Sequence, residues 1–279
     1  MGIGLGAGQY GKSDIRVVKV IRDGPRHALR DLTVDVTLRG EFEAVHVRGD
    51  NAGLPATDTM RNVVYALAAE HPLDSLPAFG AALVAHFAGA ELVHEAQVRI
   101  REHAWERLAG EQPNAFQRGA GGTRVHTVAG DGRGARHAGG LEDLLVLRTS
   151  GSSFAGFERD RFTTLPETGD RILATVVTAG WDYADRTGAA GLEPSWAAVR
   201  DRLLGAFGDH DSPSVQYTLQ RMGRAVLEHH PEIDRIALSL PNRHHLPFDV
   251  SRFGVQDRGD VFHATTEPFG LIEATIERN

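Results

Sequence analysis

The sequence predicts an α+β protein made of two tandem repeats. In each half, stretches rich in β-branched residues, typical of strands, surround two stretches with apolar residues at helical spacing. The order strand–strand–helix–helix–strand–strand occurs twice in the 279 residues, with a period of about 140 residues. This pattern indicates antiparallel sheets with two helices each on one face. We expect a first domain at residues 1–135 and a second at 136–279, with the glycine-rich segment 130–140 at the boundary.

The first half contains these stretches in a clear order. Three stretches predict strands, at residues 15–23, 29–40 and 43–49. Apolar residues then recur at helical spacing in two runs, one beginning at Thr57 and the other spanning residues 76–87. Strands resume at residues 95–105 and on both sides of the glycine-rich segment, which completes the first repeat.

The second half repeats the plan. Strands are predicted at residues 143–150, 170–183 and 234–242, and the two helical runs cover residues 196–207 and 215–226. Before the second helix we expect Ser212 to be the N-cap and Pro213 to lie in the first turn. The last twenty residues are again strand-like. Because such a sheet leaves one face and its edges uncovered, we expect a homo-oligomer that closes them into a barrel.

Composition excludes several classes of function. The net charge of −7 leaves no broad basic surface, so we expect no nucleic-acid partner. No apolar run approaches the roughly 20 residues that cross a bilayer, so we expect no membrane partner. The chain has no cysteine, which excludes disulfides, thiolate metal sites and a cysteine nucleophile. Neither end resembles a sorting signal, and we expect a cytoplasmic protein.

Lysine is scarce in this sequence. Of the 30 basic residues only Lys12 and Lys19 are lysines. A GC-rich genome accounts for the excess of arginine, but a chemical need for one of the lysines is an alternative. Lysine can lose its proton when it is desolvated or crowded by cations, whereas arginine cannot. Lys19 lies inside a predicted strand and is expected to be a solvated surface residue.

Two histidine pairs and a glycine-rich start invite interpretation as cofactor sites. His229 and His230 close a predicted helix, where the dipole favours a cation, so we expect a structural role. His244 and His245 end a predicted strand, and adjacent strand residues face opposite sides, so only one can face a given site. Neither pair has the spacing of a metal site, and we expect no metal. The start "GIGLGAG" has no strand before it and no helix after it, so it is not a dinucleotide loop.

Five segments together resemble the urate oxidase (uricase) family, in order and spacing across nearly the whole chain. They are "YGK" followed by "IRVVKV", "ATDTMRNVVYALA", "TSGSSFAGFERDRFTTLPETGDRILAT", "SVQYTLQRMG" and "LPNRHH". The resemblance implies a tandem pair of T-fold domains that assembles as a homotetramer around a tunnel, with active sites at subunit interfaces. It also implies oxidation of urate by O₂ and water to 5-hydroxyisourate and hydrogen peroxide without a cofactor.

The resemblance further implies which residues bind urate. They are Thr57, Asp58, Phe154, Arg171, Val215, Gln216 and Asn242. Phe154 would stack on the purine, and Arg171 would bind its carbonyl and ring nitrogen through the planar guanidinium. Gln216 and the backbone N–H of Val215 would match the opposite edge, and Leu165 would line an apolar wall. Thr57 and Asp58 would come from a neighbouring subunit, and Asn242 would lie beside the O₂ or water position.

Proton transfer would carry the catalysis in such an enzyme. Urate is an acid whose further deprotonation gives an electron-rich species able to reduce O₂ directly, so a base is the main requirement. The resemblance assigns a proton relay to Lys12, Thr57 and His244, in which neutral Lys12 deprotonates Thr57. Arginine at position 12 could not do this.

Two alternatives remain at the level of sequence. The first is another T-fold enzyme acting on a purine or pterin, such as a zinc cyclohydrolase, for which metal analysis is the test. The second is a non-catalytic purine-binding homologue, for which a peroxide assay is the test.

Overall fold

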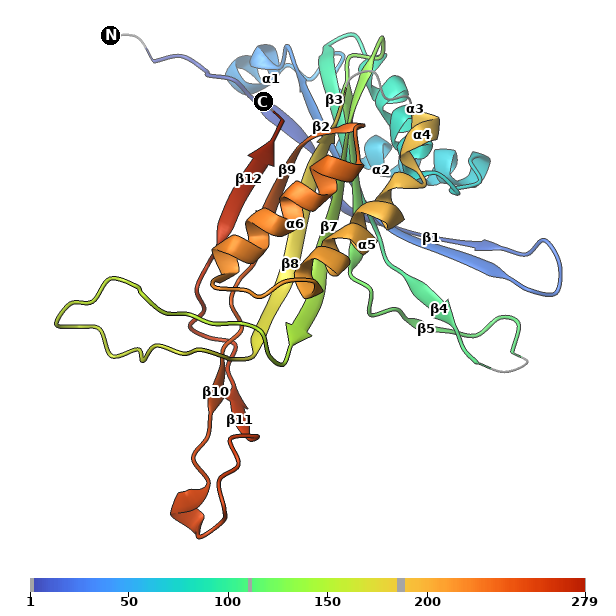
Figure 1. Cartoon of the computed structure of the whole chain (residues 1–279). Helices are drawn as coiled ribbons and strands as arrows, with labels where there is room; N and C mark the ends of the chain where they lie inside the picture. The colour runs from blue at the N-terminus through green and yellow to red at the C-terminus, as the bar shows by residue number, and fades with distance from the viewer. Residues whose placement is uncertain (1–2, 110–111, 185–188, 279) are drawn as a thin grey trace. The chain divides into compact units, whose positions relative to one another are not determined.

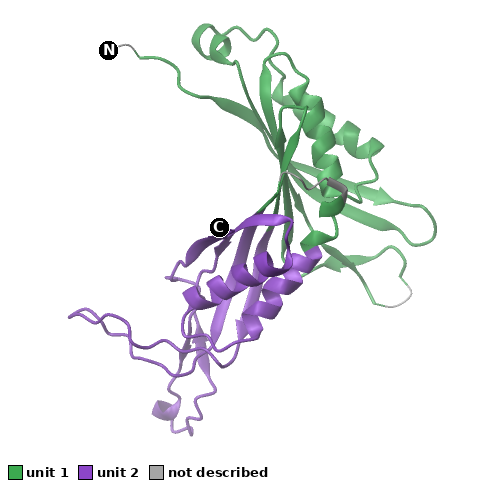
Figure 2. Ribbon diagram, turned by 45° about the horizontal axis from the view of Figure 1, so that its top comes forward, with its two compact units in different colours: residues 1–140, 182–196 green, residues 141–181, 197–279 purple. Residues whose placement is uncertain are grey.

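The structure is a computed structural model that describes residues 3–109, 112–184 and 189–278. Figures 1 and 2 show strands and helices together, which confirms the α+β prediction. The chain forms two compact units, residues 1–140 with 182–196 and residues 141–181 with 197–279. The division into domains at residue 135 stays a prediction. Within the described part of the chain, no helix has the length and apolar character needed to cross a membrane.

The first unit contains an antiparallel sheet. Its strands are hydrogen-bonded in the order β1 (Gln9–Ile21), β2 (Ala28–Gly40), β3 (Val93–Glu102) and β6 (Thr123–Gly130). In β1, Ile15 and Val17 are buried, whereas Arg16 and Val18 are exposed, because successive side chains point to opposite faces. A separate hairpin pairs β4 (Trp105–Arg107) with β5 (Phe116–Arg118).

Two helices bury the apolar face of this sheet. α2 (Thr57–Glu70) packs on β1, and α3 (Leu76–Ala88) packs on β3 and β6. Met60 of α2 and Phe79 of α3 are almost fully buried among the strand residues, as the helical spacing predicts. The N-cap of α3 is Ser75, whose side chain accepts a hydrogen bond from the backbone N–H of Ala78.

Two local expectations are wrong. Residues 43–49, expected as a strand, contain helix α1 (Glu43–Arg48). The alternation there is too short to specify a strand, and Gly49 ends a single helical segment with a left-handed φ of 68°. Its N–H donates to the carbonyl of Val45, and the N–H of Asp50 donates to the carbonyl of Ala44. The glycine-rich segment is also only partly a loop, because β7 (Ala135–Arg148) begins inside it.

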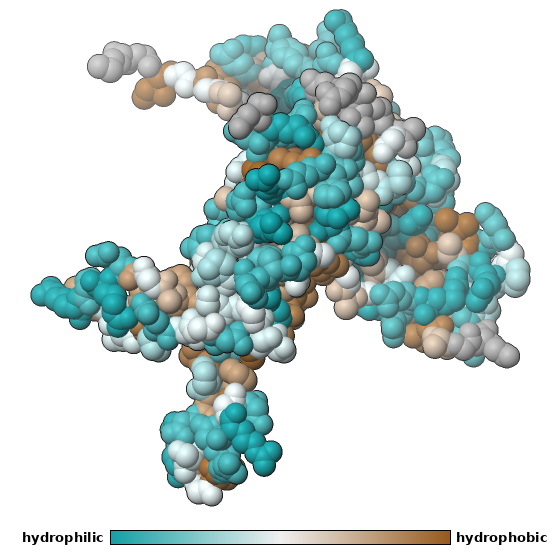
Figure 3. All heavy atoms as spheres, viewed as in Figure 1, coloured by the Kyte–Doolittle hydropathy of each residue, from teal (hydrophilic) through white to brown (hydrophobic). Residues whose placement is uncertain are grey.

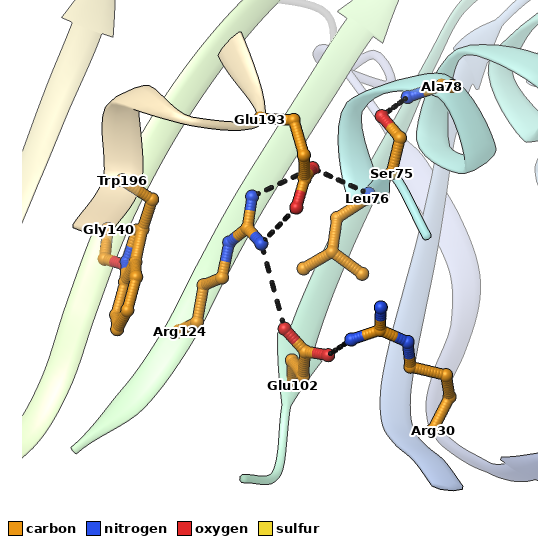
Figure 4. Close-up of polar contacts among 9 residues, drawn as sticks. All are labelled: Arg30, Ser75, Leu76, Ala78, Glu102, Arg124, Gly140, Glu193 and Trp196. Atoms are coloured by element: carbon orange, nitrogen blue, oxygen red, sulfur yellow. Dashed lines mark hydrogen bonds and ion pairs between the residues drawn. The ribbon is translucent and has the colours of Figure 1, made fainter. Parts of the chain in front are cut away.

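Glu193, which belongs to the first unit, takes part in a network of ion pairs there (Figure 4). It follows the short helix α4 (Ala189–Leu192). Glu193 accepts hydrogen bonds from Arg124, at 3.0 Å, and from the backbone N–H of Leu76, at 3.2 Å. A carboxylate is favourable at this helix start because it meets unpaired N–H groups. Glu193 therefore supports the N-terminus of α3.

The second unit has the same type of architecture. Its strands follow one another in the sheet as the later part of β7, β8 (Leu173–Tyr183), β9 (Ile233–Ser239) and β12 (Glu273–Glu277). Its two long helices are α5 (Ser195–Gly208) and α6 (Val215–His229). α6 packs on β9 and β12 and buries Met222 and Val226, as its spacing predicts. The first histidine pair closes this helix as expected, because His229 is its last residue and His230 its C-cap.

Two long excursions leave the sheet of the second unit. One is the loop at residues 149–172, and the other is residues 243–271, which contain β10 (His245–Pro247), the 3₁₀ turn η1 (Ser251–Phe253) and β11 (Phe262–Ala264). Apolar side chains on both are exposed, including Phe162 at 72% and Phe253 at 65%. Figure 3 shows apolar atoms scattered among hydrophilic ones on these segments. The two excursions supply much of the candidate site.

Candidate active site

A pocket of about 690 Å³ lies in the second unit, where the two excursions meet the start of α6. Its lining includes seven residues expected from the sequence: Phe154, Leu165, Arg171, Val215, Gln216, Asn242 and His244. The three other expected residues, Lys12, Thr57 and Asp58, belong to the first unit. Segments almost a hundred residues apart in the sequence thus converge on one cavity.

A sharp turn after β7 leads the chain into the pocket. Gly151 has a φ of 72°, which favours glycine, and a Cβ there would lie 2.5 Å from a guanidinium nitrogen of Arg148. Arg148 donates to the carbonyl of Ser150, at 2.9 Å, and to that of His210, at 2.6 Å. Sequence reasoning missed Arg148, although an arginine two residues before a Ser-Gly turn was a signal for it.

A short ladder of backbone hydrogen bonds holds two of the residues expected to bind the ligand, Phe154 and Arg171. The N–H of Ser212 donates to Gly151 at 2.8 Å, and the carbonyl of Ser212 accepts from Ser153 at 2.8 Å. On the opposite edge of this segment, the carbonyl of Ser152 accepts from the N–H of Arg171 at 2.7 Å. Phe154 exchanges two backbone hydrogen bonds with Thr168. Phe154 and Arg171 are therefore held by the same small framework.

Arg171 offers an unpaired cation inside the pocket. Its Nε atom is buried and has no hydrogen-bond partner among the described residues. Its guanidinium carbon lies 5.2 Å from the ring centroid of Phe154, and Phe157 stacks on the same ring at 5.0 Å. Burial lowers the pKa of Arg171 from its usual value. Since no carboxylate within the described ranges forms an ion pair with it, the guanidinium is placed to receive an anionic ligand.

The start of α6 supplies backbone donors to the same pocket. The N-cap is Ser214 and not Ser212 as expected: the Ser214 hydroxyl accepts from the N–H of Tyr217 at 3.1 Å, and Ser214 is extended. Pro213 consequently precedes the helix instead of lying in its first turn. Val215 and Gln216 are the first two helical residues, as expected. Backbone N–H groups at such positions attract anions and carbonyl oxygens.

Asn242 and His244 also line the pocket. The N–H of Asn242 donates to the carbonyl of Gly270 at 2.8 Å, and its side-chain nitrogen lies 3.5 Å from Nδ1 of His244. His245 lines the pocket too, contrary to the expectation that only one of the two adjacent histidines faces a given site. The reason is that β9 ends at Ser239, so strict alternation does not extend to the histidines.

The expected residues of the first unit have distinctive local settings. Lys12 pairs with Val36 and immediately precedes a β-bulge. Its neighbour Gly11 approaches β2 so closely that a Cβ would lie 1.9 Å from the carbonyl oxygen of Val36. Thr57 is the first residue of α2 and is exposed. Asp58 binds Arg61 at 2.7 Å.

Lys19 is not the solvated residue that the sequence predicts. Its ammonium donates to the carbonyls of Ala68, Ala69 and His71, at 2.9, 3.1 and 2.5 Å. These carbonyls end α2, where the helix dipole favours a cation. Lys19 therefore persists for a structural reason.

Within the described residues, no group of three or more histidine, aspartate or glutamate side chains is arranged to hold a metal ion.

The fold and the pocket define the class of this protein as one that binds a flat, acidic ligand. Tandem α+β units carry a site with an aromatic ring, an unpaired guanidinium, a helix start and two carboxamides, which together suit a flat, acidic, heterocyclic ligand.

Comparison with known proteins gives the family. A family model described as Uricase matches residues 8–129 and 137–273. Uricase from Arthrobacter globiformis is 44% identical over 275 residues, covering 98% of this chain and 90% of that protein. Uricase from Dictyostelium discoideum is 37% identical over 279 residues, covering 97% and 96%. The crystal structure of the Arthrobacter globiformis uricase matches with a TM-score of 0.93 at 43% identity, covering 100% of this chain and 96% of the other. The chain belongs to the uricase family, and the prediction of tandem T-fold domains is confirmed.

Proposed function

We propose that the chain is a urate oxidase, which converts urate, O₂ and water into 5-hydroxyisourate and hydrogen peroxide. The observation that carries the proposal is the guanidinium of Arg171, whose buried Nε has no partner among the described residues, beside the ring of Phe154 in a pocket of fitting size. Urate is a flat anion near neutral pH, so it complements a cation and an aromatic ring together. Family membership supports the same substrate.

Each side of the pocket has a role in holding urate. Arg171 binds a carbonyl oxygen and a ring nitrogen, and Phe154 contacts the face of the purine. Gln216 and the N–H of Val215 meet the opposite edge, where the helix start favours carbonyl oxygen. Asn242 lies on the side where O₂ or water would bind, 3.5 Å from His244. Leu165 contributes apolar surface.

The chemistry rests on proton removal. Deprotonated urate gives two electrons to O₂ without a metal or flavin, and the reduced oxygen takes up two protons and leaves as hydrogen peroxide. Addition of water to the oxidised ring then gives the product. We assign the base to Lys12, acting through Thr57, with His244 as the third member of the relay. The support is chemical: an amine can lose its proton reversibly, and a threonine hydroxyl passes one on. Thr57 is exposed and Lys12 is half-buried, so both side chains can be reached from outside the first unit.

Assembly belongs to the same proposal. We assign Thr57 and Asp58 to the pocket of a neighbouring subunit in a homotetramer located in the cytoplasm. The exposed start of α2 and the exposed apolar side chains of the two excursions support an interface. The proposed ligands are urate and O₂, and neither a nucleic acid nor a membrane is proposed as a partner.

The decisive experiment incubates purified, chelator-treated protein with urate. The ultraviolet absorbance of urate should fall while hydrogen peroxide appears in equal amount. A protein that works only after zinc or iron is restored would contradict the mechanism and favour another purine or pterin enzyme. A protein that binds urate but forms no peroxide would instead be a non-catalytic homologue.

A further inference from the structure

A buried chain of side-chain hydrogen bonds lies beneath the start of α6, outside the pocket lining. The Nε2 atom of His210 is 2.9 Å from the Thr218 hydroxyl, which is 2.8 Å from the Ser212 hydroxyl, which is 3.1 Å from the carbonyl of Ser214. Thr218 is 0% and Ser212 1% exposed, and the His210 side chain is 8% exposed. Buried polar groups of this kind are retained where each has a partner.

The direction of this chain follows from its end. The Ser214 carbonyl can only accept, so the Ser212 hydroxyl donates to it and must itself accept from Thr218. Thr218 has then given its only proton and must accept from the Nε2–H of His210. Each group thus has one defined orientation. On its other side, Nδ1 of His210 lies 3.3 Å from a carboxylate oxygen of the exposed Asp209.

The chain reaches the pocket at two of its members, Ser214 and Ser212. Ser214 is the N-cap of α6, so fixing its carbonyl also fixes the backbone of Val215 and Gln216, which line the pocket. The backbone of Ser212 forms hydrogen bonds with Gly151 and Ser153. Ser152, which lies between these two residues, accepts a hydrogen bond from the N–H of Arg171. Ser212 therefore connects the two sides of the pocket between which the purine ring would lie, the start of α6 and the segment that holds Arg171.

We infer that His210, Thr218 and Ser212 are positioning residues for urate, which hold the start of α6 at a fixed separation from Arg171 and Phe154. The inference deepens the proposed function and rests on it. Without the chain, the buried N–H of His210 and the hydroxyl of Ser212 lose partners and the segment at residues 209–214 relaxes. The binding groups then fit the purine less well in both the bound substrate and the transition state. Because both states lose the same binding energy, KM rises more than kcat falls.

A pair of substitutions at one position tests this. Thr218→Val keeps the shape but removes the hydroxyl, whereas Thr218→Ser keeps the hydroxyl. We expect Thr218→Val to raise KM, and the Kd for urate measured without O₂, about 5- to 30-fold, with kcat changed by less than about threefold. Thr218→Ser should remain within about twofold of the wild type in KM. Ser212→Ala should behave like Thr218→Val, and it carries the test if that variant does not fold.

Ser75→Ala is the matched control for a purely structural effect. It removes the N-cap of a helix in the first unit, so it should lower Tm without changing KM. If Thr218→Val and Ser212→Ala lower Tm but leave KM and Kd at wild-type values, the positioning role is wrong while the proposed function stands. Wild-type protein that neither binds nor consumes urate would overturn the proposed function and this inference with it.

Discussion

The ammonium nitrogen of Lys19 lies 2.5 Å from the carbonyl oxygen of His71, just beyond the end of α2. Two further carbonyls share the same ammonium, so its three donors all have acceptors. Lys19→Met should therefore destabilise the fold by about 1–2 kcal/mol, since it leaves the helix end without its cation. Chemical denaturation would show a lower midpoint, with kcat near that of the wild type. Unchanged stability would mean that water replaces the ammonium at no cost.

Lys12→Met should remove most of the turnover while urate still binds. The substitution keeps an unbranched apolar chain of similar length but deletes the base. We expect kcat to fall about 10²- to 10⁴-fold, the usual contribution of a general base. Stopped-flow turnover gives kcat, and titration with urate in the absence of O₂ gives Kd. A variant that retains full turnover would remove Lys12 from the relay.

Mixing two inactive variants tests whether active sites are shared between subunits. Thr57→Ala and Arg171→Gln should each be nearly inactive alone. If Thr57 of one subunit completes the pocket that holds Arg171 of another, random co-assembly gives some sites with neither substitution, so about a quarter of wild-type activity returns. The variants are mixed after dissociation or co-expressed, and activity is compared with each variant alone. No recovery in verified mixed oligomers would place both residues in one subunit.

A buried histidine pair in the first unit should make stability depend on pH. Nε2 of His126 lies 3.0 Å from Nδ1 of His137. Burial, followed by the neighbouring His137, lowers the pKa of His126 to about 3, and burial also lowers the pKa of His137. The unfolded chain binds these protons near pH 6.5 and the folded chain does not, so stability is lost as the pH falls below that value.

The expected size of this effect is measurable. Between pH 7 and pH 5, His126 alone should account for about 2 kcal/mol of lost stability. His126→Gln cannot titrate, so its stability should change less over this range, even if it is lower at pH 7. Denaturation at several pH values and one protein concentration gives the comparison. Equal pH dependence in both proteins would contradict the assignment.

Much of the pocket lining was predictable from the sequence, because it comes from short segments with distinctive side chains. Phe154, Arg171 and Gln216 line one pocket as the resemblance implies. The helices were predictable too, since α2, α3, α5 and α6 each show an apolar stripe that the core requires. How the pocket residues are placed relative to one another depends on the backbone hydrogen bonds of Ser152 and Ser212. Backbone hydrogen bonds of this kind place few demands on residue type, so the sequence does not predict them.

The errors come from local competition, from long-range contacts and from irregular backbone. Ser212 and Ser214 are equally good caps by composition, and only the geometry of the turn decides that Ser214 takes the role. Lys19 reads as a surface residue because the carbonyls it binds lie about fifty positions away in sequence. His245 could not be placed because alternation holds only inside a regular strand. Long-range contacts and irregular backbone are therefore what residue patterns alone do not reveal.

The deep burial of Met60 and Met222 in the helix faces has a chemical consequence. The only other methionine is Met1, and cysteine is absent. Sulfur is the atom that peroxide oxidises most readily, and its susceptibility follows its accessibility. An enzyme that releases hydrogen peroxide at every turnover thereby keeps two of its three sulfur atoms shielded from this product. The shielding favours retention of activity over many turnovers.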